Sequence, residues 1–311
     1  MQEIEKLVKT LRELRIGRYP PPIVVESGTP VVEVLREMAD KWVRHAIVVE
    51  PGTKKLSGMV SIRGVLEFLG GGERHKIVEE KYGGDLYKAL FEEPVDSIQY
   101  PPPYVTLDDT LIDVVELMVE RDIGALAVTD REGNVVGKIS ERHIMSLFAA
   151  TKMFVRVAEL MSSPLITMHP QDPLIECQRL MKAKRIRRIV LKDSRGIRGI
   201  VSVKDIAKYY SSPEVLERLR LHGEEDVHGT PLCYVAVREV ATVSPEVDLG
   251  DAIKMMRERN IGSLVVVDEE GRDLGIITER DFIRKLPRIW GVDLFVDEAQ
   301  KLIIAGRTAF L

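Results

Sequence analysis

The sequence predicts an α/β (α+β) protein built from four tandem β-α-β-β-α repeats. Two observations support this prediction. The same helical stripe of apolar residues occurs four times. Each stripe is followed by a β-branched segment, a glycine-containing turn and a second apolar segment that begins at a glycine. Self-similarity at a spacing of some tens of residues is typical of repeat architectures, so the internal repeat is the main guide to the fold.

The long helix of each repeat is predicted from apolar residues at positions i, i+3, i+4 and i+7, which fall on one face of a helix. Capping residues or Thr-Pro and Asp-Pro pairs stand just before the stripes, as expected at a helix start. One member of the third stripe, Gln178, is polar. The four stripes are Val31, Val34, Leu35, Met38; Leu111, Val114, Val115, Met118; Leu174, Cys177, Gln178, Met181; and Leu249, Ala252, Ile253, Met256.

Three strands and a closing helix complete each repeat. We expect first strands at 23–25, 104–106, 165–168 and 241–243, and middle strands at 46–49, 125–129, 188–191 and 264–267, because these segments are short and apolar and most are rich in β-branched residues. Third strands are expected to begin at the glycines, after turns that contain glycine or proline. These glycines are Gly58, Gly137, Gly199 and Gly275.

The spacing of the repeats predicts two tandem pairs. The four glycines are 79, 62 and 76 residues apart, so a long interval lies inside each pair. One repeat buries too little surface to be stable alone, and pairing would cover its small sheet. The predicted divisions are an N-terminal helix (1–17), repeats at 18–70, 94–150, 151–210 and 233–286, connectors at 71–93 and 211–232, and a C-terminal tail (287–311).

The order of elements and the pattern G-h-x-[S/T]-x-x-D, where h is apolar, resemble CBS domains, which associate in pairs as Bateman modules. The resemblance covers about residues 18 to 286. The four-copy count is similar to the gamma subunit of AMP-activated protein kinase and its stand-alone archaeal relatives. That resemblance implies two modules in a flat disc, with ligand clefts that bind adenosine compounds.

Two repeats carry the complete pattern, with Ser202 and Asp205 in the third and Thr278 and Asp281 in the fourth. The resemblance implies that Asp205 and Asp281 bind ribose, and a carboxylate can accept two hydrogen bonds from a diol. The first repeat has Gly64 at this position and the second has His143, so whether these two repeats bind anything stays open. The alternative is structural, because S/T-x-x-D is also a helix capping box.

The resemblance further implies that each cleft is shared by two repeats. Apolar residues on either side would contact adenine, and a recurring set of polar and basic residues would bind phosphate. The alternative for the basic residues is a solvated or ion-paired surface. The expected base contacts are Ile166, Ile186, Ile200, Ala241, Ile261, Gly262 and Ile276, and the expected phosphate contacts are Ser202, Thr278, Lys204, Arg280, Arg187 and Arg188.

Composition and motifs exclude several classes of protein. Two cysteines in 311 residues exclude a disulfide framework, and a net charge of −4 gives no sign of nucleic-acid binding. The sequence has no run of about 18 apolar residues that could span a membrane, and we expect a cytoplasmic protein. We find no paired nucleophile and base and no metal-ligand cluster, so neither a catalytic nor a metal site is expected.

The sequence therefore predicts a non-enzymatic sensor that binds AMP, ADP or ATP, chiefly in its C-terminal pair of repeats, and regulates a partner protein that is not identified. A homodimer is also possible. Two alternatives stay open, another adenosyl ligand such as S-adenosylmethionine, or a scaffold without ligand. The tail with Trp290, Leu294 and Phe295 could dock a partner or pack on its own module.

Overall fold

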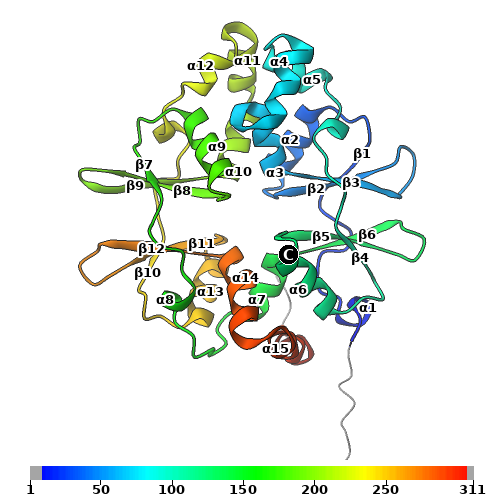
Figure 1. Cartoon of the computed structure of the whole chain (residues 1–311), viewed down its shortest axis with the longest axis vertical. Helices are drawn as coiled ribbons and strands as arrows, with labels where there is room; N and C mark the ends of the chain where they lie inside the picture. Colours follow the sequence, from blue (N-terminus) through cyan, green and yellow to red (C-terminus); the bar gives the residue numbers. More distant parts are fainter. Residues whose placement is uncertain (1–8, 307–311) are drawn as a thin grey trace, which may run out of the picture. The chain divides into compact units, whose positions relative to one another are not determined.

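The computed structural model describes residues 9–306 and contains four three-stranded sheets, one in each predicted repeat (Figure 1). In every sheet the first strand runs parallel to the middle strand, and the middle strand is antiparallel to the third. The strands are β1 (Val24–Glu26), β2 (His45–Val49) and β3 (Leu56–Ser61); β4 (Tyr104–Thr106), β5 (Ala125–Thr129) and β6 (Val135–Ser140); β7 (Thr167–Met168), β8 (Arg188–Asp193) and β9 (Gly196–Ser202); and β10 (Thr242–Val243), β11 (Ser263–Val267) and β12 (Asp273–Thr278). The predicted α/β repeat architecture is confirmed.

Two helices flank each sheet. The long helix after the first strand carries the predicted apolar stripe, and Cys177 on the third stripe is fully buried. A closing helix follows the third strand. The long helices are α2 (Val31–Asp40), α6 (Leu111–Glu120), α9 (Leu174–Ala183) and α13 (Leu249–Glu258), and the closing helices are α3 (Ile62–Leu66), α7 (Glu141–Leu147), α10 (Val203–Ser211) and α14 (Glu279–Trp290).

The remaining helices lie before the repeats, inside the predicted connectors and at the C-terminal end. A short helix precedes each first strand, and the segments predicted as connectors are largely helical. The preceding helices are α1 (Leu11–Leu14), η3 (Val95–Ser97), α8 (Val157–Leu160) and η4 (Leu232–Tyr234); those in and beside the connectors are η1 (Glu67–Gly71), η2 (Glu73–His75), α4 (Lys76–Tyr82), α5 (Leu86–Glu92), α11 (Pro213–His222) and α12 (Glu224–His228); and α15 (Val292–Ile304) follows the last repeat. Residues 1–8 of the predicted N-terminal helix and residues 307–311 of the predicted tail lie outside the described residues.

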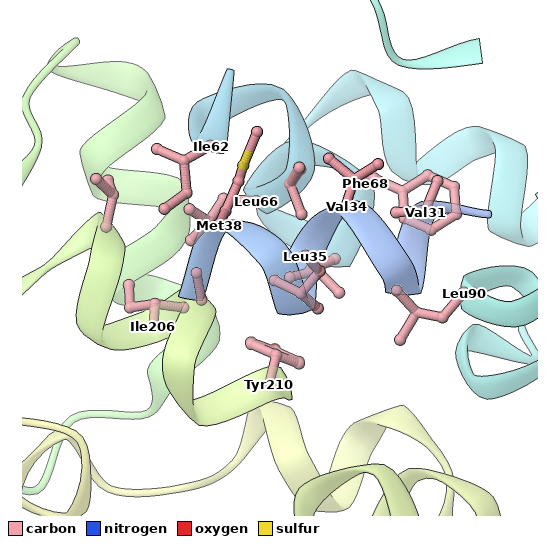
Figure 2. Packing of buried hydrophobic residues seen from close by; sticks show 14 of the residues in the cluster. Val31, Val34, Leu35, Met38, Ile62, Leu66, Phe68, Leu90, Ile206 and Tyr210 are labelled. Carbon is pink, nitrogen blue, oxygen red and sulfur yellow. The ribbon is translucent and has the colours of Figure 1, made fainter. Parts of the chain in front are cut away.

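The chain divides into two compact units, and each combines alternate repeats. The first unit holds Met1–Pro21, Pro103–Leu165 and Ala241–Leu311, with the second and fourth repeats; the second unit holds Pro22–Pro102 and Ile166–Val240, with the first and third. In the second unit α10 packs on α2 and α3, and in the first unit α14 packs on α6 and α7. Figure 2 shows the core of the second unit, where Ile206 and Tyr210 lie beside Leu35 and Met38. The sequence did not predict this helical pairing.

A short segment before each first strand, which we call the lead segment, bonds to the third strand of the neighbouring repeat. Tyr100 bridges Met59 in the first repeat, and Arg18 bridges Lys138 in the second. Ser162 and Val237 make the matching bridges to β12 and β9. Each of these bridges lies within one compact unit, so a lead segment belongs to the unit of the strand that it crosses.

The third strands begin two or three residues before the predicted glycines, so their predicted starts are wrong. The glycines lie inside the strands because the lead segments cross them. A Cβ on Gly199 would lie 2.9 Å from the Val237 carbonyl oxygen, and one on Gly275 would collide with the Ser162 carbonyl oxygen. The matching neighbours of Gly58 and Gly137 are the side chains of Gln99 and Tyr19. At each of these glycines it is the chain itself that makes the close approach.

The last helix packs on the first unit, which was one of the two expectations for the tail. Phe295 on α15 is fully buried and stacks on Phe148 at 5.2 Å between ring centroids, with Phe282 at 5.6 Å. Leu294 beside it is 48% exposed. The helix is therefore part of the core of this unit, although one edge faces solvent.

Replacing Phe295 with alanine should lower the free energy of unfolding by about 3–5 kcal/mol, since it leaves a cavity among aromatic rings. Replacing the exposed neighbour Leu294 with alanine should change it by no more than about 0.5 kcal/mol. Denaturant unfolding of the two variants tests this, and equal losses would show that α15 does not contribute to the core as described.

Candidate functional site

The capping hydroxyl of every repeat lies at one place, where the third strand meets the closing helix. It stands opposite the first residue of the middle strand, so Ser202 pairs with Arg188 and Thr278 with Ser263. The next backbone N–H donates to the carbonyl before the middle strand, from Val203 to Arg187 at 3.0 Å in the third repeat. These bonds fix the start of each closing helix against its sheet, so the side chains that follow are held in equivalent positions.

In the third repeat Asp205 uses one carboxylate oxygen for folding. Its Oδ2 accepts hydrogen bonds from the Ser202 backbone N–H at 2.8 Å and from Ser202 Oγ at 2.6 Å, which completes a capping box. Within residues 9–306 the hydrogen bonds to this carboxylate all end on Oδ2, and the side chain is half-buried. The other oxygen, Oδ1, keeps its capacity to accept hydrogen bonds.

In the fourth repeat both oxygens of Asp281 are engaged. Oδ2 accepts from the Thr278 N–H at 3.0 Å and from Thr278 Oγ1 at 2.6 Å. Oδ1 accepts from Ser162 Oγ at 2.6 Å and forms an ion pair with Lys285 Nζ at 2.8 Å. The residue is only 7% exposed. The two complete motifs, alike in sequence, therefore differ in structure.

The first two repeats keep the cap without the carboxylate. Gly64 donates its backbone N–H to Ser61 Oγ at 3.1 Å, and a Cβ there would meet Arg74 Nη1 at 3.3 Å. In the second repeat, His143 Nδ1 accepts the Ser140 N–H at 3.1 Å, as the carboxylates do elsewhere. Burial, together with the nearby cations Lys138, Arg142 and Arg18, lowers the pKa of His143 to about 4. The ring is therefore neutral near pH 7.

The predicted phosphate-binding residues lie in different surroundings. Ser202 and Thr278 are helix caps. Lys204 donates to the Trp42 carbonyl oxygen at 3.2 Å and lies 4.6 Å from the centre of its ring, while Arg280 pairs with Asp122. The pairing of Arg280 matches the ion-paired alternative. Arg187 directly precedes β8, and Arg188 is the first residue of that strand. Both are half-buried and lie next to the cap of α10.

The predicted base-contacting residues fall into both units. Ile166, Ile186 and Ile200 belong to the second unit and are half-buried. Ala241, Ile261, Gly262 and Ile276 belong to the first unit, and of these only Gly262 is buried. Ile200 and Ile276 each bond to a lead segment, through Val237 and Ser162. The predicted clefts draw on both sets, and this combination stays a prediction.

Sequence reasoning missed Ser162 and Lys285. Lys285 also donates to the carbonyl oxygens of Leu160 at 2.7 Å and Met161 at 3.1 Å, at the end of α8. The spacing of Asp281 and Lys285, four residues apart on a helix, is a signal that could have identified the pair. Ser162 gives no such signal, because it is 119 residues away in the chain.

No group of three or more His, Cys, Asp or Glu side chains within residues 9–306 could hold a metal ion. Over the same residues, no helix has the length and apolar character needed to cross a bilayer.

The sequence model of the CBS domain matches four stretches of the chain, residues 11–71, 95–150, 157–212 and 234–288. The chain belongs to the CBS domain family. Each match begins in the short helix that precedes the first strand of its repeat. The first three matches end just after the closing helix, and the last ends inside α14, two residues before the end of that helix.

Two relatives match most of this chain and nearly all of their own length. An uncharacterised 33.4 kDa protein encoded in a ribosomal RNA operon of Thermofilum pendens is 45% identical over 96% of this chain and 99% of its own length. The uncharacterised protein MJ1225 of Methanocaldococcus jannaschii is 23% identical over 88% of this chain and 98% of its own.

Solved structures agree on the fold. The crystal structure of MJ1225, described as a proposed archaeal homolog of g-AMPK, matches with a TM-score of 0.79 at 22% identity, over 87% of this chain and 98% of that one. An uncharacterised conserved protein from Pyrococcus horikoshii matches with a TM-score of 0.53 at 18% identity, over 88% and 98% of the two chains. The predicted likeness to stand-alone archaeal CBS proteins is thus confirmed.

The buried neutral His143 predicts a pH-dependent contribution to stability. Its folded pKa of about 4 lies below the ordinary value of 6.5, so the unfolded state binds more protons between these values. The contribution should be complete above about pH 6.5 and lost as the pH falls towards 4, by at most about 3 kcal/mol. The variant His143→Gln keeps an acceptor for the Ser140 N–H and should show a flatter profile. An imidazole NMR titration with a midpoint near 6.5 would refute this prediction.

Proposed function

We propose that this CBS-domain protein is a non-enzymatic regulatory sensor that binds an adenine nucleotide, AMP, ADP or ATP, at the Asp205 carboxylate. The observation that carries the proposal is the oxygen Oδ1 of Asp205, which is not used by the capping box. A carboxylate oxygen can accept two hydrogen bonds, and the two neighbouring hydroxyls of ribose supply two donors. The capping box holds this acceptor in place before any ligand arrives.

The charges around Asp205 favour a phosphorylated ligand. Arg188 stands opposite Ser202 in the sheet, and Arg187 directly precedes it. Arginine binds phosphate through forked hydrogen bonds, and each bond is strengthened by charge. A sulfonium ligand such as S-adenosylmethionine needs no such group, so the basic pair favours the nucleotide over this alternative.

Apolar groups suit the base. Ile200 lies two residues before Ser202 on β9 and is half-buried, as is Ile186 beside Arg187. Aliphatic side chains pack well on the faces of adenine, and backbone groups can recognise its edge. We propose that these residues of the third repeat contact the base.

The regulatory step follows from differential affinity. A ligand shifts a conformational equilibrium only as far as it binds one state better than the other. Val237, in the lead segment before β10, bonds to Ile200 on β9, so a ligand beside this strand can act on the lead segment. The description of MJ1225 as a proposed homolog of g-AMPK fits a regulatory role, with a separate protein as the regulated partner.

Calorimetric titration with AMP, ADP, ATP and S-adenosylmethionine tests the proposal. At least one nucleotide should bind, and Asp205→Asn should weaken its binding by about 10- to 100-fold, since hydrogen bonds to a charged acceptor are lost. Asparagine can keep the cap with its single oxygen, and it then presents an NH2 donor to the ribose. The exposed carboxylate of Asp251 on α13 provides the control Asp251→Asn, which should bind normally.

Other outcomes separate the alternatives. Binding of S-adenosylmethionine in preference to every nucleotide would replace the proposed ligand class. No binding by ligand-free protein to any of the four compounds would contradict the sensor and favour a scaffold.

A further inference from the structure

We propose that the two motif carboxylates have different roles: Asp205 accepts the ribose diol, whereas Asp281 is saturated by the protein and tethers the lead segment of the third repeat. This inference rests on the proposed function and narrows it to one tight site per chain. It follows from the hydrogen-bonding capacity of the two side chains and from what surrounds each of them.

An ionised carboxylate offers about four lone-pair positions. At Asp281 three donors use them, the N–H and Oγ1 of Thr278 on Oδ2 and Ser162 Oγ on Oδ1, and Oδ1 is also ion-paired with Lys285 Nζ. At Asp205 the donors within residues 9–306 are the N–H and Oγ of Ser202, both on Oδ2. A vicinal diol needs two acceptor positions, and Oδ1 of Asp205 offers both, whereas Oδ1 of Asp281 already holds a hydrogen bond and an ion pair.

Lys285 holds the tether at Asp281 through several contacts. Lys285 Nζ lies within 2.7–3.2 Å of the Leu160 and Met161 carbonyl oxygens and Ser162 Oγ, besides Asp281. Cations are stabilised at the C-terminal end of a helix, and α8 ends at these carbonyls. A ligand that took Oδ1 would therefore have to separate a partly buried ion pair and release the end of α8.

The third repeat has no equivalent of this tether. Val237 occupies the lead-segment position that Ser162 has in the fourth repeat, because each bridges the matching isoleucine of its third strand. Tyr209 is four residues after Asp205, as Lys285 is after Asp281, but its hydroxyl bonds to Thr230 Oγ1 at 2.8 Å and Arg218 Nη1 at 2.7 Å. An apolar side chain and an already bonded phenol replace the two donors, so the Asp205 oxygen stays available.

Calorimetry with AMP on the full chain tests the inference. The wild type should show one tight binding event, which Asp205→Asn weakens by at least about tenfold. Asp281→Asn should not remove that event. The double variant Ser162→Ala/Lys285→Met clears Oδ1 of Asp281 and should gain a second event, within about tenfold of the first in affinity.

The matched control is Ser163→Ala/Lys301→Met. Ser163 is the next residue of the lead segment, and Lys301 is an exposed lysine of α15 that pairs with Glu298. This control removes the same two side-chain types without touching Asp281. It should show one binding event, as the wild type does.

A second measurement tests the tether without nucleotide. The single variants Asp281→Asn and Lys285→Met and the double variant Asp281→Asn/Lys285→Met form a double-mutant cycle. Their changes in the free energy of unfolding should be clearly non-additive, because the two residues are in contact. Additive effects would overturn the tether. Two equally tight AMP events in the wild type, one lost in each aspartate variant, would overturn the inference and leave the proposed function intact. No binding of AMP, ADP or ATP, with non-additive unfolding, would instead overturn the proposed function and the assignment of Asp205 with it.

Discussion

The site depends on one local constraint, the capping box at the start of each closing helix. The hydroxyl and the residue three positions later satisfy N–H groups that the helix cannot satisfy itself. His143 Nδ1 in the second repeat accepts the same backbone N–H that Asp205 and Asp281 accept in theirs. In the first repeat Gly64 offers no side-chain acceptor, and Ser61 Oγ alone caps the helix. The cap therefore needs no negative charge, and a carboxylate at this position uses one oxygen for it. What the second oxygen does is set by the surroundings.

The lead segments are the second constraint. Each crosses a neighbouring third strand at a glycine that leaves no room for a side chain, as at Gly199 beside the Val237 carbonyl. The crossing places one lead-segment residue next to each motif. It is Ser162 in the fourth repeat, which donates to the carboxylate, and Val237 in the third, whose side chain has no donor. The segments that join the repeats thus also determine the chemistry of the site.

The sequence predicted the repeated elements because their signals are local. Apolar periodicity, β-branched runs and turn residues specify a strand or a helix within about ten residues. The pairing of α10 with α2 and of α14 with α7 has no local signal, since it depends on which helix faces fit together. For the same reason the partners of Lys204 and Arg280, Trp42 and Asp122, could not be predicted: each pair is more than 150 residues apart in the chain. Asp205 and Asp281 could be identified as motif residues, but the difference between them could not, because Ser162 is a distant residue.

Repetition explains how one position can serve two purposes. In a single-copy protein, a change that saturates the binding carboxylate would abolish binding. In this chain the third repeat keeps an available oxygen, so the carboxylate of the fourth can hold α8 and its lead segment through Lys285 and Ser162. An ion pair of this kind contributes through its geometry and its further hydrogen bonds more than through charge alone, since desolvation offsets much of the attraction. Because Lys285 bonds to two backbone carbonyls as well as to Asp281, losing this contact would loosen the chain leading into β7. Under the proposed function, ligand binding at one motif and rigidity at the other are complementary uses of the same sequence pattern.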